Sequence, residues 1–374
     1  MLLVCVTLTV NQAVPVITWP TPAAISYGTA LSATQLDATA NVAGTFTYSP
    51  AVGAVLAAGS QTLSVTFTPA NTTNYTTATA SVALTVNQAA PYVTQLFAST
   101  QLVYPGATNV TVCVVGTKAM PTGSIQIDAG STVLTTLSLQ GNGCGYWYIS
   151  PGLNAGTYSI TSVYSGDSNN PRGTSAPTVL TVSPVPVNMS ASCWNASFPY
   201  GANYQCTVNV SSNAGSAQGN ITYSYDSGAP VAVPLSGGSA QFTITEPPVG
   251  TQNVVIGYAQ QTNYAAAQPQ TENFTVTSAA VQVSLAPSTW YATVGTNITF
   301  SAAVASWSAG PPQNGSVSFY DGSTLLSTVP VNSSGQGSYT TSSLPAGSQT
   351  ITAAYSGGAN YASGSTGVTI TLAQ

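Results

Sequence analysis

The chain has 374 residues, of which two are cationic (Lys118 and Arg172), seven are acidic and none is histidine. Two cations cannot release enough counterions to hold a polyanion, so nucleic acid is excluded as a partner. Charged residues make up 2% of the chain, against an ordinary fraction of about 25%, so Ser, Thr, Asn, Gln and Gly must form the solvated surface.

The first residues predict a β-strand that has no partner within the chain. The segment Leu8–Pro15 is nearly identical to Leu84–Pro91, which closes the first repeat described below. Residues 1–12 therefore look like the last strand of a domain whose remainder is absent. We expect either that the chain is cut from a longer array or that this orphan strand pairs with another molecule. The candidates for such strand addition are the alternating residues Val4, Val6, Leu8 and Val10.

One short sequence pattern occurs four times and defines the repeat units of the chain. Each copy begins at a glycine and ends on an aromatic residue eight positions later. Alternate positions between them form one mostly apolar face and one polar face, which predicts a half-buried β-strand. The glycines are 97, 94 and 97 residues apart, so this is one strand of a unit repeated four times. The copies are Gly59–Phe67, Gly156–Tyr164, Gly250–Tyr258 and Gly347–Tyr355.

This spacing divides the chain after residue 12 into four predicted domains, which we call repeats one to four. They span residues 13–90, 91–183, 184–278 and 279–374. In repeat one, Gly44 lies 15 residues before Gly59, whereas the corresponding gaps in the other repeats are 33, 31 and 32 residues. Repeat one should therefore lack about a hairpin in its middle. No stretch has a helical period, so the whole chain is predicted to be β-structure.

Short strands separated by turn signals, in units of this length, are typical of an immunoglobulin-like sandwich. The segments Ile17–Gly28, Gly315–Gly322 and Ala346–Tyr361 also resemble bacterial Ig-like tandem repeats. The resemblance implies a secreted or cell-surface protein, in which such domains serve mainly as spacers, stalks and adhesive modules. Repeat two departs from the pattern, with Asn170-Pro171 where the other repeats have Asn-Tyr.

Five cysteines are present, and four of them form pairs within single repeats. Such pairs predict structural disulfides made in an oxidising compartment, Cys113 with Cys144 and Cys193 with Cys206, although buried free thiols are the alternative. Cys5 has no partner in its own segment, so it is a candidate for an intermolecular bond.

The sequence gives little support for catalysis or for a bound metal. A Ser-His or Cys-His nucleophile needs a base, and there is no histidine. The acids are scattered, and Asp128, Asp226 and Asp321 fall beside glycines at equivalent points, which favours hairpin turns over catalytic carboxylates. Asp167 could contribute to a calcium site, but one carboxylate is too few for tight binding. We therefore predict a protein that is not an enzyme and has no cofactor.

Two further surface features can be read from the sequence. In Tyr146-Trp147-Tyr148 alternation places Trp147 on one face and the two tyrosines on the other, so at least one ring is partly exposed, and Trp147 is the candidate for stacking on a glycan. Eleven sequons for N-glycosylation also occur, although a chain rich in Ser and Thr produces several by chance. They are Asn71, Asn74, Asn109, Asn188, Asn195, Asn209, Asn220, Asn273, Asn297, Asn314 and Asn332.

No apolar run approaches the ~18–20 residues of a membrane span, and Met1–Val6 is too short for a secretion signal. Sheet edges are usually defended with charge, and this chain has almost none. We therefore expect an extracellular or cell-surface structural protein, a rod-like stalk or filament subunit that self-associates or contacts other surface components, with N-terminal strand addition as one route. The alternative is an adhesin that binds carbohydrate.

Overall fold

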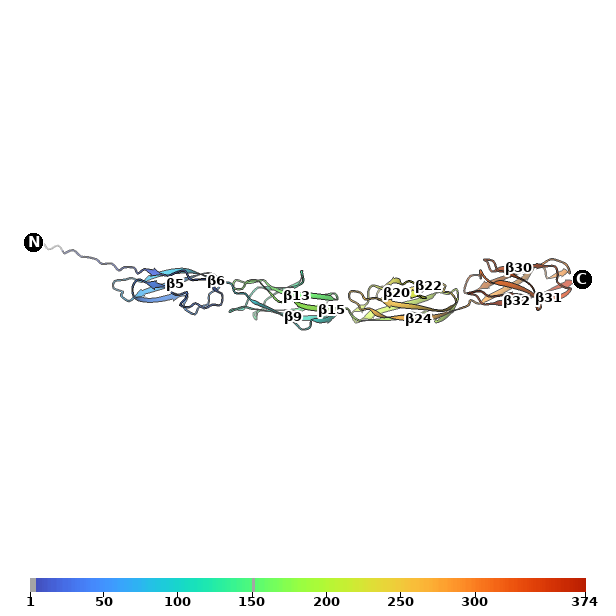
Figure 1. The fold of residues 1–374 in the computed structure, drawn as a ribbon, viewed down its shortest axis with the longest axis horizontal. Helices are drawn as coiled ribbons and strands as arrows, with labels where there is room; N and C mark the ends of the chain where they lie inside the picture. The colour runs from blue at the N-terminus through green and yellow to red at the C-terminus, as the bar shows by residue number, and fades with distance from the viewer. Residues whose placement is uncertain (1–4, 150–151) are drawn as a thin grey trace. The chain divides into compact units, whose positions relative to one another are not determined.

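The computed structural model describes residues 5–149 and 152–374, and every regular element in those ranges is a β-strand (Figure 1). In the described ranges, no helix is long and apolar enough to span a membrane. The chain separates into two compact units, Met1–Ser183 and Pro184–Gln374. The break between them coincides with the boundary expected between repeats two and three, whereas the division into four domains stays a prediction.

Repeat one forms a four-stranded sheet in the order β2-β6-β5-β4 and a two-stranded sheet of β1 and β3. Strand β4 lies at an edge of the larger sheet. It is followed directly by β5, whereas two strands intervene at this point in each other repeat. The predicted shortening of repeat one is confirmed, but the two missing strands belong to different sheets elsewhere and do not pair as a hairpin. The strands are β1 Ile17–Thr18, β2 Ile25–Ser26, β3 Thr39–Ala40, β4 Gly44–Ser49, β5 Gly59–Pro69 and β6 Ala78–Asn87.

Repeat two forms a three-stranded sheet, β12-β9-β7, and a larger sheet, β11-β10-β13-β15-β8, in which β14 also pairs with β13. All pairs are antiparallel except that of β15 with β8. The strands are β7 Tyr92–Phe97, β8 Gln101–Val103, β9 Thr108–Val115, β10 Ser124–Ala129, β11 Thr132–Ser138, β12 Cys144–Ile149, β13 Gly156–Tyr164, β14 Gly173–Thr174 and β15 Thr178–Ser183.

Repeats three and four follow the same plan. Repeat three has β18 paired with β16, β19 and β22, and a sheet β17-β24-β23-β20-β21. Its strands are β16 Val187–Cys193, β17 Ser197–Pro199, β18 Tyr204–Ser212, β19 Gly215–Ser216, β20 Asn220–Tyr225, β21 Val231–Pro234, β22 Ser239–Ile244, β23 Gly250–Tyr258 and β24 Ala267–Thr277. Repeat four has sheets β25-β27-β30 and β26-β32-β31-β28-β29. Its strands are β25 Val281–Pro287, β26 Tyr291–Thr293, β27 Ile298–Ser306, β28 Ser316–Asp321, β29 Thr324–Pro330, β30 Gln336–Thr341, β31 Gly347–Tyr355 and β32 Gly364–Ala373.

The two sheets of a repeat pack face to face around a shared apolar core. In repeat four, Ile298 and Phe300 of the three-stranded sheet belong to the same buried cluster as Val317 and Ile351 of the five-stranded sheet. A corresponding cluster joins the two sheets of repeat two. These repeats are therefore β-sandwiches of the immunoglobulin-like type, as the strand pattern predicts.

The four copies of the repeated pattern form β5, β13, β23 and β31, each of which begins at its predicted glycine. The third residue of each copy donates a side-chain hydrogen bond to the backbone carbonyl four positions earlier, which fastens the loop before the strand. The donor and acceptor pairs are Gln61 with Ala57, Tyr158 with Asn154, Gln252 with Pro248 and Gln349 with Pro345. A glutamine or tyrosine recurs at this position because both side chains carry a donor that reaches this carbonyl.

The aromatic residue that ends each copy of the pattern is buried. In repeats two, three and four it is a tyrosine, whose hydroxyl donates to a backbone carbonyl at 2.6, 2.6 and 2.7 Å. The donor and acceptor pairs are Tyr164 with Thr122, Tyr258 with Gln218 and Tyr355 with Asn314. Burial raises the pKa of all three phenols, so they remain donors. Repeat one has Phe67 at this position and lacks the bond.

The residue after each acceptor carbonyl is a glycine with positive φ, at +106° for Gly123, +96° for Gly219 and +92° for Gly315. A side chain at Gly315 would also meet the ring of Tyr355, since an added Cβ would lie 2.7 Å from its Cε2 atom. The glycine therefore allows the loop to turn tightly over the tyrosine ring.

The linker before each repeat pairs with the loop between its last two long strands. The backbone carbonyls of Asn74, Asn169, Asn263 and Asn360 accept hydrogen bonds from Ala13, Ala89, Val185 and Ala279 in turn. In repeat two, Asn169-Asn170 therefore takes the place of Asn-Tyr, and the predicted alignment with Asn170-Pro171 is wrong by one residue. The buried Asn170 side chain occupies the position that tyrosine has elsewhere.

We expect Tyr355→Phe to destabilise repeat four by about 1–2 kcal/mol, because the Asn314 carbonyl loses its buried donor. Hydrogen exchange measured by mass spectrometry should show faster exchange of the β31 amides. Tyr291→Phe is the control, since that ring is 79% exposed. Equal exchange in the two variants would contradict a stabilising role for the hydroxyl.

Candidate functional site

The acidic residues do not gather into a catalytic or metal-binding centre. Among residues 5–149 and 152–374, no group of three or more His, Cys, Asp or Glu side chains is placed to hold a metal ion. Asp128 and Asp321 lie at the ends of β10 and β28, where hairpins begin. Asp226 follows β20 with φ of 45°, so it adopts the left-handed conformation that a turn requires. The hairpin interpretation of these three residues is confirmed.

Asp167, the candidate calcium ligand, organises a loop through hydrogen bonds from N–H groups. Its Oδ1 accepts the backbone amides of Asn169 and Asn170 at 2.8 Å each, and its Oδ2 accepts the amide of Thr122 at 2.9 Å. Burial raises the pKa of the Asp167 carboxyl, but these hydrogen bonds outweigh that effect and lower the pKa to about 2. The carboxylate oxygens face donors, which is the arrangement of a structural loop and the opposite of a cation site.

We predict that Asp167→Asn lowers the free energy of unfolding at neutral pH by about 1–2 kcal/mol, after allowance for solvent screening. The folded pKa lies below the unfolded value of 3.8. The native carboxylate therefore contributes fully above pH 4, and its contribution is lost as the pH falls from about 4 through about 2. Denaturant titrations at several pH values measure this dependence. Asp37→Asn, at an exposed position, is the control, and an unchanged acid limb in the Asp167 variant would refute the assignment.

Both predicted disulfides are confirmed, and each joins residues directly opposite on neighbouring strands. Cys113 of β9 is bonded to Cys144 of β12, and Cys193 of β16 is bonded to Cys206 of β18. The bonds lie on different faces of their sheets. Cys206 is 2% exposed and points into the core, whereas Cys113 alternates with the buried Val112 and Val114 and so points outward. The first bond therefore lies on the solvent face of repeat two.

The N-terminal segment is exposed and forms no strand over residues 5–12. Val6, Leu8 and Val10 have exposed fractions of 81%, 86% and 82%. Cys5 is an exposed free cysteine, and Val4 lies outside the described residues. Strand addition by this segment and an intermolecular bond from Cys5 stay predictions.

The aromatic triplet on β12 has the opposite orientation to the one that glycan stacking on Trp147 would require. Trp147 is half-buried and packs against the core of repeat two. Tyr146 and Tyr148 point outward with exposed fractions of 51% and 57%. Trp147 is thus a core residue, and the two tyrosines present the rings to solvent. The predicted disulfide could have revealed this orientation from the sequence. Alternation places Cys113 on the face opposite to Val110, Val112 and Val114. Its partner Cys144 must then lie on that same outer face, together with Tyr146 and Tyr148, which alternate with it.

These tyrosines belong to a larger apolar surface on the outer face of the sheet β12-β9-β7, which we call the tyrosine face. Its members are exposed side chains on all three strands: Tyr92, Leu96, Val115, Tyr146 and Tyr148. The Cys113–Cys144 bond lies between them, in the row that also contains Thr94.

The group 3 bacterial Ig-like domain family matches the chain over residues 96–183 and again over residues 283–373. The chain contains bacterial Ig-like domains. The two matches fall in repeats two and four, and no curated protein matches the chain.

Several solved structures are similar to this chain. The D1–D4 ectodomain fragment of ICAM-5 is 13% identical, with 96% of this chain and 99% of that chain covered and a TM-score of 0.36. Sidekick-1 immunoglobulin domains 1–5 are 12% identical, with coverage of 96% and 81% and a TM-score of 0.34. The Escherichia coli adhesin FdeC is 17% identical, with coverage of 76% and 97% and a TM-score of 0.28.

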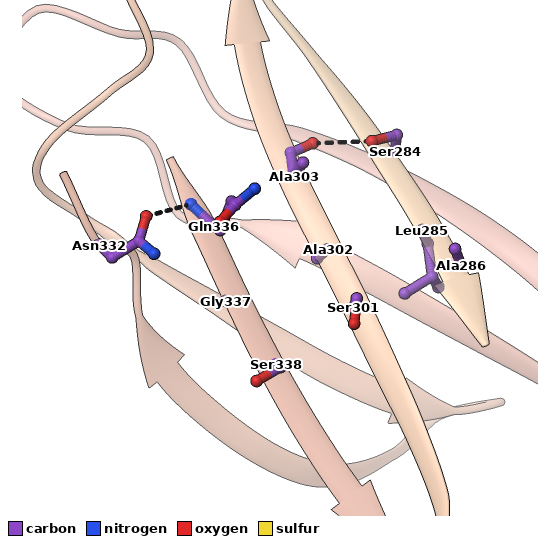
Figure 2. A pocket seen from close by; sticks show the side chains of 10 residues that line it. All are labelled: Ser284, Leu285, Ala286, Ser301, Ala302, Ala303, Asn332, Gln336, Gly337 and Ser338. Carbon is purple, nitrogen blue, oxygen red and sulfur yellow. Dashed lines mark hydrogen bonds between the residues drawn. The ribbon is translucent and has the colours of Figure 1, made fainter. Parts of the chain in front are cut away.

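The two matched bacterial Ig-like domains differ on the same outer face. In repeat four this face is a shallow hollow of about 480 Å³ over β25, β27 and β30. Figure 2 shows the residues that line it, most of which are Ser, Ala or Gly, with Ser284 hydrogen-bonded to the carbonyl of Ala303. By strand register, Ala303 and Ser338 stand where repeat two has Cys113 and Tyr146. One Ig-like domain thus has a hollow where the other has protruding rings.

The sequon asparagines of these Ig-like domains and of the other repeats are all exposed. Asn109 is directly opposite Tyr148 at one end of the tyrosine face, and Asn332 lies at the hollow of repeat four. Every sequon is therefore accessible on the folded chain, and glycosylation itself stays a prediction.

Proposed function

We propose that the chain is a non-enzymatic structural protein of the cell exterior, a stalk or filament subunit made of tandem Ig-like domains. Two disulfides, which form in oxidising compartments, support the location. The nearly uncharged surface supports it too, because cleavage after Lys or Arg has only two possible positions in the whole chain.

The observation that carries the proposal is a contact between successive repeats that recurs in both compact units. In the first unit, the amide of Ala58 donates to the side-chain oxygen of Asn169 at 3.0 Å. In the second unit, the amide of Val249 donates to the side-chain oxygen of Asn360 at 3.3 Å. In both, the donor immediately precedes the glycine that starts the repeated strand, and the acceptor lies in the next repeat. The same connection thus fastens one repeat to the next.

Other contacts reinforce the junction in the first unit. The Gln88 side chain donates to the backbone carbonyl of Asp167 at 2.8 Å, and the amide of Ala119 donates to the hydroxyl of Tyr27 at 3.2 Å. The loop that Asp167 organises is therefore also the loop that holds repeat one. A junction fixed at several points transmits load between domains, which is the property that a stalk needs.

We expect Asn169→Ala combined with Asn360→Ala to loosen these junctions while the individual sandwiches stay folded. Small-angle X-ray scattering of the full chain should then require a broader ensemble of domain arrangements than the native protein does. Asn332→Ala is the matched control, because that side chain accepts bonds from Ser334 and Gln336 within the single loop between β29 and β30. A broadened ensemble in the control alone, or in neither variant, would count against a fastened stalk.

Within this proposal, the filament version requires an acceptor for the N-terminal strand, and repeat one offers one. Strand β4 is an edge strand because repeat one lacks the strand that pairs with this edge in the other repeats, namely β11, β21 or β29. Beside it lies a cavity of about 430 Å³ whose lining includes Leu36, Phe46, Tyr48 and Val52. An added strand could pair with the edge of β4 while alternate apolar side chains enter this cavity.

Val6, Leu8 and Val10 of a second copy have the spacing that such an addition needs. We predict that changing all three to aspartate abolishes self-association of the full chain, because each carboxylate would have to enter an apolar cavity. Light scattering over a range of concentrations measures the association. Thr7→Asp, Thr9→Asp and Asn11→Asp together form the matched control, since they add the same charge on the opposite side of the strand. Native chains that stay monomeric, or equal association in the two variants, would exclude strand addition.

The alternative function is that of an adhesin for carbohydrate. It is favoured by one specific observation, the exposed tyrosines on the tyrosine face of repeat two.

A further inference from the structure

We propose that the tyrosine face of repeat two binds an uncharged oligosaccharide, whose rings stack on Tyr146 and Tyr148 and whose hydroxyls reach a polar groove beside Tyr92. This site is independent of self-association through the N-terminal strand. It replaces the predicted stacking residue, Trp147, which packs against the core.

The tyrosine face differs from the same face of repeats three and four. In repeat three, the outward residues of the three paired strands are all Ser, Thr, Asn or Gln. In repeat four they are mainly Ser, Ala, Thr and Gln. Only in repeat two does this face carry three tyrosines with a leucine and a valine, all more than half exposed. An apolar surface at one of three equivalent positions is not needed by the fold, so its exposed rings are available for contact with a ligand.

The size of the tyrosine face suits a small ligand better than a second copy of the chain. It is three strands wide and four residue rows long, which corresponds to roughly 10 by 20 Å, or about 200 Å², at ordinary strand spacings. A stable interface between proteins buries about 800 Å² on each partner. The tyrosine face therefore has room for a few sugar rings but is too small to hold two proteins together alone.

The chemistry of the site selects an uncharged ligand with both apolar and hydroxyl groups. None of the residues of the tyrosine face is charged, so a charged ligand would lose its hydration without gaining a partner. Tyrosine rings present an electron-rich apolar surface. A pyranose ring complements it, because its faces carry C–H groups and its rim carries hydroxyls.

A groove at the edge of the tyrosine face supplies hydrogen-bonding groups for that rim. It has a volume of about 260 Å³, begins at Tyr92 and Thr94, and is lined on its far side by Thr174, Ser175 and Thr178. A hydrogen-bond network fixes its wall. The amide of Gln95 donates to the Thr178 hydroxyl and to the carbonyl of Ala176, each at 2.9 Å. Stacking surface and hydroxyl-lined groove are thus continuous through Tyr92.

The site is also held rigidly before any ligand arrives. The Cys113–Cys144 bond ties β9 to β12 in the middle of the tyrosine face. The side-chain amide of Asn142 donates to the hydroxyl of Tyr146 at 2.8 Å and orients its ring. Because the rings and strands are already ordered, binding loses little conformational entropy.

The test is isothermal calorimetry of the full chain with neutral oligosaccharides of glucose, mannose, xylose, galactose and N-acetylglucosamine, and with an oligogalacturonate as the charged probe. We expect at least one neutral probe to bind and the charged probe not to bind. Tyr146→Ala combined with Tyr148→Ala should weaken binding by about tenfold or more. The matching pair of Phe substitutions should retain most of it, because the rings remain.

Tyr291→Ala and Trp307→Ala are the controls, since their rings are 79% and 89% exposed but lie away from the tyrosine face, and they should bind as the native chain does. Absence of binding to every neutral probe would overturn the proposal, as would equal binding by the double alanine variant. If that variant instead abolished only self-association measured by light scattering, the partner would be a second copy of the chain.

Discussion

The hydrogen bond from a buried tyrosine hydroxyl to a backbone carbonyl is the interaction on which repeats two, three and four depend. The Tyr355 hydroxyl, for example, connects the end of β31 to the carbonyl of Asn314, two residues before β28 begins. The ring fills the core while the hydroxyl fixes the loop that leads into the neighbouring strand. One side chain therefore sets both the packing of the sandwich and the start of a strand that is distant in sequence. Repeat one has Phe67 instead and also lacks two strands, so it is the simplest of the four.

The second constraint is the scarcity of charge. With two cations and seven acids, the chain cannot use ion pairs to hold its loops or to protect its sheet edges. Neutral hydrogen bonds hold the loops instead. The side chains of Gln61 and Gln349 bind the loops before their strands, and the side chains of Asn169 and Asn360 bind the preceding repeat. The one carboxylate with a strongly lowered pKa, Asp167, is bound by backbone amides.

Much of the fold could be predicted from the sequence because a period of two along a strand and a regular return of glycine and aromatic residues are local signals. The positions of β5, β13, β23 and β31 follow from them directly. The candidate site was harder to predict. Alternation separates Trp147 from Tyr146 and Tyr148, but it does not say which side faces the core, and that depends on how β12 pairs with β9. The alignment of Asn169 was also missed, because its role depends on a bond to Ala89 in the linker.

The position of the Cys193–Cys206 bond has a consequence for the chain under tension. Strand β16 enters repeat three at Val187 and is bonded covalently to β18 at its far end, Cys193. A force that pulls on the linker can peel β16 from β18 residue by residue only until it reaches this bond. Once this bond is reached, the force is transmitted through the disulfide to Cys206, whose side chain points into the core of the sandwich. Repeat three therefore has a built-in limit to how far its first strand can be drawn out while the disulfide is intact.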